Sequence, residues 1–189
     1  QSFADWDQSL PVGSASSRRT LQFQMQYPAC TVHPIRGNVL TRLEKLDRGE
    51  YGALILAEAG LQRLGLEHRI TRRFCPAEIV PAAGQGILAV QGRAGEYTAL
   101  LQRLNDPQAA FCAKIERAVS KALNGDCTAP IGAYADLQGE QVTLYGFYAE
   151  DGIGIKSTLT GSVTQAESLA NTFAEQLKQQ VQAKKEAML

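Results

Sequence analysis

Short apolar runs alternate with amphipathic stretches along the first eighty residues. Isolated apolar runs of this length are typical of buried strands, whereas apolar residues recurring every three or four positions indicate helices. The pattern predicts a helix at 16–27, a strand at 30–34, a helix at 38–48, a strand at 52–57 and a helix at 59–64. Strands that alternate with helices are typical of a parallel or mixed sheet covered by helices, so this part is predicted to be an α/β domain.

The pattern becomes irregular from residue 76. Two prolines and the Gly84-Gln85-Gly86 turn precede a strand-like apolar run at 87–90, and a helix is expected at 95–104. Asn105-Asp106-Pro107 then interrupts the helical pattern. Because asparagine, aspartate and proline favour turns over helix interiors, we expect a domain boundary at this point.

The remaining residues predict a small α+β domain. A helix at 108–123 is followed by three strand-like segments at 131–137, 141–149 and 153–160. Turn signals separate these segments, which favours an antiparallel meander. A last helix is expected to begin at Thr164, where Thr164 and Glu167 have the spacing of a capping box.

Composition and charge exclude several classes of protein. The chain has 189 residues, of which 44% are hydrophobic and 20% charged, as in ordinary globular proteins. Nineteen basic residues balance nineteen acidic residues, which argues against a partner that is nucleic acid or a membrane surface. No apolar run approaches the roughly 18 residues of a membrane span, and the first residues lack the pattern of a signal peptide.

The cysteines predict neither a metal site nor a redox motif. No two of the four lie at CxxC spacing, which excludes a zinc ribbon or a thioredoxin motif. A domain of this length does not need disulfides, so a reducing cytoplasm is the expected location. Cys30, Cys75 and Cys112 lie in apolar runs and are expected in the core. Cys127 follows Asp126 on a loop, where an inert thiol and a modified one are both open.

Arginines occur at two predicted helix starts. With Ser16 as the N-cap, Arg18 and Arg19 fall in the first helical turn, where the helix dipole favours acids instead. Arg36 and Arg42 similarly surround the expected N-cap Asn38. Free amide groups and guanidinium groups together form a pocket for an anion.

Arg63 adds a fifth arginine near the end of the helix that follows the second strand. In a doubly wound sheet the loops after the strands gather at one edge, where ligands bind. The five arginines therefore favour a ligand with several carboxylates or phosphates. The alternative interpretation is a set of solvated surface arginines.

These stretches resemble the porphobilinogen deaminase (hydroxymethylbilane synthase) family. The resemblance rests on VGSASSRR (12–19), on the block 36–70 that begins RGNVLTRL, and on PAAGQGILAVQGR (81–93), IERAVSKALNGDC (115–127) and PIGAYA (130–135). It implies a periplasmic-binding-protein-like α/β domain with a mixed sheet, then an α+β domain with a three-stranded antiparallel sheet and helices on one face. The implied division is 1–80, a crossing segment at 81–106, and 107–189.

The family resemblance also implies a function. Members join four porphobilinogen molecules head to tail with release of ammonia, a step of tetrapyrrole and heme biosynthesis. Their primer is a dipyrromethane cofactor, attached through a thioether that corresponds here to Cys127. Each pyrrole ring carries an acetate and a propionate, and the residues implied to hold these carboxylates are Ser16, Arg18, Arg19, Arg36, Asn38, Arg42 and Arg63.

The same resemblance implies that the chain corresponds to the second and third domains of the family. The family's catalytic aspartate, which stabilises positive charge on the pyrrole nitrogen, has no counterpart here, so the chain alone is expected to be inactive. A separate first domain is an expected partner. The crossing segment should expose an apolar edge open to self-association. A non-catalytic module that binds polycarboxylate pyrroles is the alternative.

Overall fold

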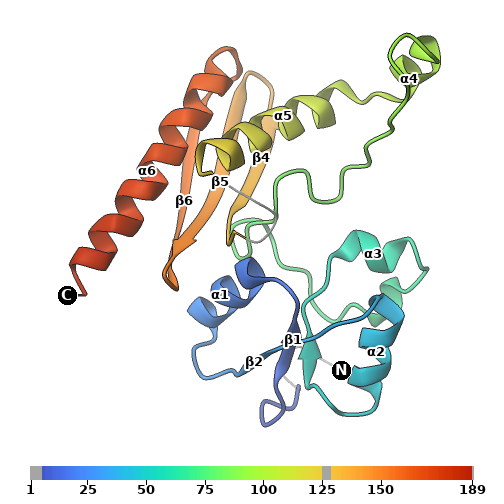
Figure 1. The fold of residues 1–189 in the computed structure, drawn as a ribbon, viewed down its shortest axis with the longest axis vertical. Helices are drawn as coiled ribbons and strands as arrows, with labels where there is room; N and C mark the ends of the chain where they lie inside the picture. The colour runs from blue at the N-terminus through green and yellow to red at the C-terminus, as the bar shows by residue number, and fades with distance from the viewer. Residues whose placement is uncertain (1–5, 125–128, 189) are drawn as a thin grey trace.

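Two sheets with separate helices make up the protein, which we describe from a computed structural model of residues 6–124 and 129–188 (Figure 1). The N-terminal unit contains β1 (Val12–Ser14), α1 (Ser17–Gln26), β2 (Val32–Pro34), α2 (Val39–Asp47), β3 (Ala53–Leu54), α3 (Glu58–Gln62) and the 3-10 turn η2 (Glu67–Arg69). The rest contains α4 (Thr98–Leu104), α5 (Pro107–Ala122), β4 (Gly132–Gln138), β5 (Gln141–Glu150), β6 (Ile153–Ser162), the 3-10 turn η3 (Val163–Gln165) and α6 (Ala166–Glu186).

The N-terminal sheet is parallel, with strand order β2-β1-β3. The expected mixed sheet is therefore wrong for the described residues, in which every pair of this sheet is parallel. Strand β3 is also shorter than the strand expected at 52–57, because only Ala53 and Leu54 pair with β1. Gly13 allows the close packing of β1, since a Cβ there would lie 2.5 Å from Cδ2 of Leu54.

The antiparallel β4-β5-β6 meander confirms the prediction for the C-terminal unit. Helices α5 and α6 pack on one face of this sheet, as Figure 1 shows. Gly146 of β5 permits the close approach of α6, because a Cβ there would lie within 2.8 Å of atoms of the Phe173 ring and of a Leu177 methyl group. Those two side chains are fully buried and form the centre of this core.

The start of α6 differs from the predicted capping box. Ser162 is the N-cap of the turn η3, and its hydroxyl accepts a hydrogen bond from the Thr164 amide and lies 2.9 Å from the Thr164 hydroxyl. Helix α6 then starts at Ala166 without a side-chain cap. Glu167 pairs instead with Lys114 of α5, so the box residues are used for other contacts.

The segment between η2 and α4 has no strand, so the predicted strand at 87–90 is wrong. Its apolar side chains are nevertheless exposed, as expected: Leu88 keeps 72% and Val90 63% of its accessible surface. In Figure 1 this segment leads away from both sheets to α4. Since a strand forms only beside a partner strand, the apolar run alone does not produce one here.

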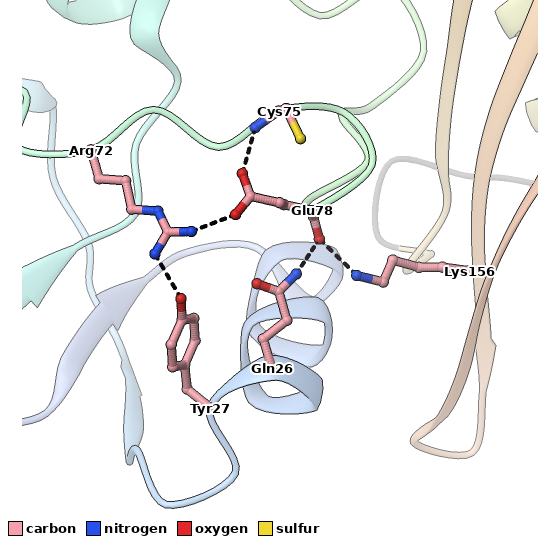
Figure 2. Close-up of polar contacts among 6 residues, drawn as sticks. All are labelled: Gln26, Tyr27, Arg72, Cys75, Glu78 and Lys156. Carbon is pink, nitrogen blue, oxygen red and sulfur yellow. Dashed lines mark hydrogen bonds and ion pairs between the residues drawn. The ribbon is translucent and has the colours of Figure 1, made fainter.

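The two units meet at residues 78–81. Val80 packs with Phe147 and Ala149 on the face of β5 opposite the helices. The backbone oxygen of Glu78 accepts hydrogen bonds from Gln26 of α1 at 2.5 Å and from Lys156 of β6 at 2.8 Å (Figure 2). One carbonyl thus joins a helix of the first unit to a strand of the second. The predicted boundaries at residues 80 and 106 stay a prediction.

Candidate carboxylate-binding site

Helix α1 begins as the sequence predicts, with two arginines in its first turn. Ser16 is the N-cap, and its hydroxyl accepts a hydrogen bond from the amide of Arg19 at 3.4 Å. The first turn contains no acid. Arg18 and Arg19 therefore stand where the helix dipole already contributes positive potential.

Arg18 is 95% buried and held by the connecting segment. One terminal nitrogen, Nη1, donates to the backbone oxygen of Val80 at 2.5 Å, and Nη2 donates to Oε1 of Gln85 at 3.1 Å. Burial, aided by the charge of Arg19, lowers the pKa of Arg18 to about 10. The side chain is still protonated at neutral pH, so the fold keeps a poorly solvated cation here.

Arg19 lies beside it and shares a partner. Its Nη1 donates to the backbone oxygen of Ile55 at 3.5 Å, and its Nη2 donates to Oε1 of Gln85 at 3.1 Å. Burial and the positive charge of Arg42 lower the pKa of Arg19. Arg19 thus contacts the residue that follows β3, at the edge where the ends of parallel strands are expected to bind ligands.

Helix α2 repeats the predicted start. Oδ1 of Asn38 accepts a hydrogen bond from the Thr41 amide at 2.9 Å, which makes Asn38 the N-cap. Arg42 donates through Nε to the backbone oxygen of Gly37 at 2.8 Å. Gly37 has a φ of 114°, a conformation that other residues rarely adopt.

Arg36 and Arg63 are not brought into the group. Arg36 lies exposed in the loop after β2, and Arg63 lies exposed at the C-cap of α3. Among the described residues, no hydrogen bond or ion pair joins either of them to Arg18, Arg19 or Arg42. The contacts therefore bring together two of the five predicted arginines, Arg18 and Arg19, and the charge of Arg42 acts on Arg19.

A cavity of about 710 Å³ opens beside Arg18 and Arg19. Apolar side chains, including Val12, Phe23 and Ile55, form part of its lining. Gln85, Arg18 and Arg19 belong to its polar lining. An apolar surface beside paired guanidinium groups suits a ligand with a flat apolar body and carboxylates at its edge.

Three residues that contact this site were not predicted. Gln22 pairs with Val80 in the manner of a neighbouring strand: its Oε1 accepts from the Val80 amide at 2.7 Å and its Nε2 donates to the Val80 oxygen at 3.0 Å. Gln85 bridges the two arginines. The only sequence signal for Gln22 is its place one turn after Arg18, on the same helix face.

Glu116 of α5 is the third. Its Oε2 accepts a hydrogen bond from the Gly84 amide at 2.7 Å, and its Oε1 accepts from the Ala135 amide at 3.0 Å. Burial raises the pKa of Glu116, and the two amide donors partly oppose that rise. A buried acid thus fixes the turn that contains Gln85 to the C-terminal unit.

The burial of the cysteines differs in part from the prediction. Cys30 is buried and Cys112 half-buried, but Cys75 is exposed, so its expected place in the core is wrong. Cys75 lies on an irregular turn where its amide donates to Oε2 of Glu78 at 2.9 Å (Figure 2). Cys127, the predicted attachment residue, lies at 125–128, outside the described residues.

Neither a cluster of metal ligands nor a membrane-spanning helix occurs in the described part of the chain. No group of three or more His, Cys, Asp or Glu side chains there is placed to hold a metal ion. No helix in residues 6–124 or 129–188 has the length and apolar character needed to cross a membrane.

Comparison with known proteins gives the family. Residues 1–100 match the family model described as porphobilinogen deaminase, dipyromethane cofactor binding domain, and residues 110–179 match that of the porphobilinogen deaminase C-terminal domain. The first match does not confirm the prediction that the chain contains only the second and third domains.

Curated relatives agree with these matches. Porphobilinogen deaminase of Acetivibrio thermocellus is 52% identical over 87% of this chain and 56% of that protein. The Alkaliphilus oremlandii protein of the same name is 47% identical over 91% of this chain and 58% of that protein. The chain thus spans little more than half the length of these relatives. It belongs to the porphobilinogen deaminase family.

Proposed function

We propose that this chain takes part in hydroxymethylbilane synthesis, the stepwise head-to-tail condensation of four porphobilinogen molecules. Each condensation forms one carbon–carbon bond and releases one ammonia molecule. The observation that carries the proposal is the adjacent pair Arg18 and Arg19, whose Nη2 atoms point to one shared acceptor. The names of the relatives support this activity and do not favour a non-catalytic binding module.

The described residues fit a dipyrromethane cofactor. Its carboxylates would be held by Arg18, Arg19 and Arg42, and its rings would lie against the apolar lining of the cavity. When bound, the cofactor supplies the pyrrole carbon to which the first substrate unit is joined. We propose attachment through Cys127, with Ser16, Arg36, Asn38 and Arg63 as further carboxylate-binding residues.

The protein's own part in this chemistry is binding and orientation. Two guanidinium groups fixed by the carbonyls of Val80 and Ile55 define where a carboxylate lies. Burial strengthens their attraction for an anion, because less water screens the charges. Holding a carboxylate in one place fixes the ring that carries it, which removes much of the entropic barrier to joining two rings.

For these 189 residues alone we infer no turnover. The family resemblance implies that the aspartate that stabilises the pyrrole cation has no counterpart among these residues, and loss of one such group lowers a rate by about 10²–10³. A chain supplying the family's first domain is the proposed partner, and the cytoplasm the proposed location. Turnover of porphobilinogen by the pure chain, measured as ammonia release, would contradict the inference.

Substitution of Arg19 tests the binding proposal. Arg19→Gln should weaken porphobilinogen binding at least about tenfold, because a charge-assisted pair is lost. Isothermal titration calorimetry gives the dissociation constant. Arg117→Gln, which removes an exposed arginine from α5, is the matched control and should bind as the wild type does. Equal affinities for Arg19→Gln and the control would refute the role of Arg19.

Mass spectrometry tests the attachment. The intact chain, expressed in cells together with the proposed first-domain partner, should carry the mass of one dipyrromethane. Cys127→Ser should abolish this increment, whereas Cys75→Ser, which changes an exposed thiol elsewhere, should retain it. If Cys75→Ser abolishes the increment and Cys127→Ser retains it, the cofactor is attached to Cys75 and the proposal is wrong.

A further inference from the structure

Gln85 occupies the position that best suits a ligand carboxylate. Its single Oε1 accepts one hydrogen bond from Nη2 of Arg18 and one from Nη2 of Arg19, each at 3.1 Å. The opposite nitrogens, Nη1, are engaged by the backbone oxygens of Val80 and Ile55. The shared amide oxygen therefore lies on the side of both guanidinium groups that a ligand would approach.

A neutral amide is a weak partner for this pair of cations. Its hydrogen bonds to the guanidinium groups are charge-assisted on one side only, because the amide carries no charge that could neutralise the arginines. Arg18 is buried and lies beside a second positive charge, so a neighbouring anion would stabilise its charged form strongly. A carboxylate oxygen at the position of Oε1 would accept the same two hydrogen bonds and neutralise charge as well.

The turn that carries Gln85 can let it leave. Gln85 is exposed and lies between Gly84 and Gly86, whose φ angles are 71° and 91°. No atom lies within 4 Å of a Cβ built on either glycine, so the turn has open space around it. The exposed side chain of Gln85 can therefore turn away from the arginines while the Gly84 amide keeps its hydrogen bond to Glu116.

We propose that Gln85 is a placeholder: its side-chain oxygen satisfies Arg18 and Arg19 in the free protein and is displaced when a ligand carboxylate binds. This inference rests on the proposed function of the arginine pair. Gln85 is thus a specificity-determining residue, because a ligand must bind better than the amide does. A neutral analogue without a carboxylate cannot displace it.

The segment that carries Gln85 is joined to the C-terminal unit by two hydrogen bonds that involve its backbone. The Gly84 amide donates to Glu116 of α5, and the Ala133 amide of β4 donates to the oxygen of Pro81 at 2.9 Å. Helix α5 and strand β4 are the elements on either side of residues 125–128 in the sequence. The arginine pair and the elements that flank Cys127 thus contact the same short segment, residues 80–85.

Gln85→Ala and Gln85→Glu give opposite predictions for porphobilinogen affinity. Removal of the competing oxygen should tighten binding about fivefold, which corresponds to one ordinary hydrogen bond. A glutamate should pair permanently with the arginines and weaken binding at least about tenfold. Gln91→Ala and Gln91→Glu, at an exposed glutamine of the same segment, are the controls and should change the affinity less than about twofold.

A structural role for Gln85 gives a different result. If the glutamine contacts the ligand or merely supports the turn, Gln85→Ala binds porphobilinogen more weakly than the wild type does. That outcome, or unchanged affinity in both Gln85 variants, would overturn the proposal.

Acetate separates this inference from the proposed function. In Gln85→Ala the arginines lack their shared acceptor, so acetate should raise the Tm to a plateau, at constant ionic strength set with chloride. The wild type should need about fivefold more acetate to reach its plateau, and Gln85→Glu should show none. The same acetate response in all three proteins overturns the inference. The expected acetate response without any porphobilinogen binding counts against the proposed function alone.

Discussion

The two carboxylate oxygens of Glu116 accept hydrogen bonds from two separate parts of the chain, the Gly84 turn and strand β4. Both donors are backbone amides, which carry no charge. The acid is only 4% exposed, so the amides replace water as its solvation. Burial still outweighs them and raises the pKa of Glu116, which means that the fold favours the protonated acid.

The pH dependence of stability should show this preference. Above the unfolded pKa of about 4.3, the folded state binds the proton more tightly, so the contribution of Glu116 to stability falls as pH rises. Glu116→Gln, an isostere of the protonated acid, does not titrate. As pH rises, the free energy of unfolding of Glu116→Gln should increase relative to that of the wild type, by about 1.4 kcal/mol for each unit by which folding raises the pKa.

Urea unfolding at a series of pH values measures this difference. Glu44→Gln, which removes an exposed carboxyl from α2, should follow the wild type at every pH. A wild type that becomes more stable than Glu116→Gln as pH rises would show that the carboxylate is the preferred form.

Individual contacts were the least predictable level from sequence. Ser16 and Asn38 were predicted as N-caps because their donors lie three residues away. The partners of Gln22 and Gln85 lie 58 and 67 residues away, and no local pattern reports such distances. The exposure of Cys75 was missed because an apolar neighbourhood in sequence does not require burial in space.

Helix α2 shows how much a single cap contributes at the scale of an element. It has nine residues, too few to be stable alone in water, so its first turn depends on Asn38. Asn38→Ala should lower the free energy of unfolding by about 1 kcal/mol, within the usual range of about 0.5–2 kcal/mol.

Chemical denaturation followed by circular dichroism gives this value. Asn171→Ala is the matched control, because Asn171 lies exposed in the interior of α6, where alanine has the higher helix propensity. The control should be unchanged or slightly more stable. A loss of the same size in both variants would mean that the cap has no special role.

Elements were predicted well where one segment determines its own structure. The meander β4-β5-β6 follows from alternation and turn residues within thirty-one positions, and each strand pairs with the next along the chain. The run 87–90 has the same apolar character but no strand beside it among the described residues. The capping box at Thr164 failed because the Thr164 hydroxyl lies 2.9 Å from that of Ser162 and hydrogen-bonds with it, while Glu167 pairs with Lys114.

Exposed apolar residues between the two units bear on the behaviour of the whole molecule. Leu88 and Val90 lie on the connecting segment, and Leu100 and Leu104 extend the exposed apolar surface onto α4. Burial of such side chains stabilises an association by about 25 cal/mol for each Å² of apolar surface. Self-association of the chain through this segment stays a prediction.

Sedimentation velocity across a range of protein concentrations tests it. The double variant Leu88→Ser and Val90→Ser should lower the sedimentation coefficient at high concentration to that of a monomer. Met188→Ser, which changes an exposed apolar residue at the other end of the chain, should associate as the wild type does. A wild type that is monomeric at every concentration would contradict the prediction.

Residues 78–84 hydrogen-bond to both units, and this has a consequence for amide hydrogen exchange. The Val80 amide is bonded to Gln22, the Gly84 amide to Glu116, and the Ala133 amide to Pro81. None of the three can exchange unless a contact between the segment and one unit opens. Although the two sheets have separate cores, these protons should exchange together, as one cooperative unit. The irregular segment would then be among the slowest-exchanging parts of the chain, although loops ordinarily exchange first.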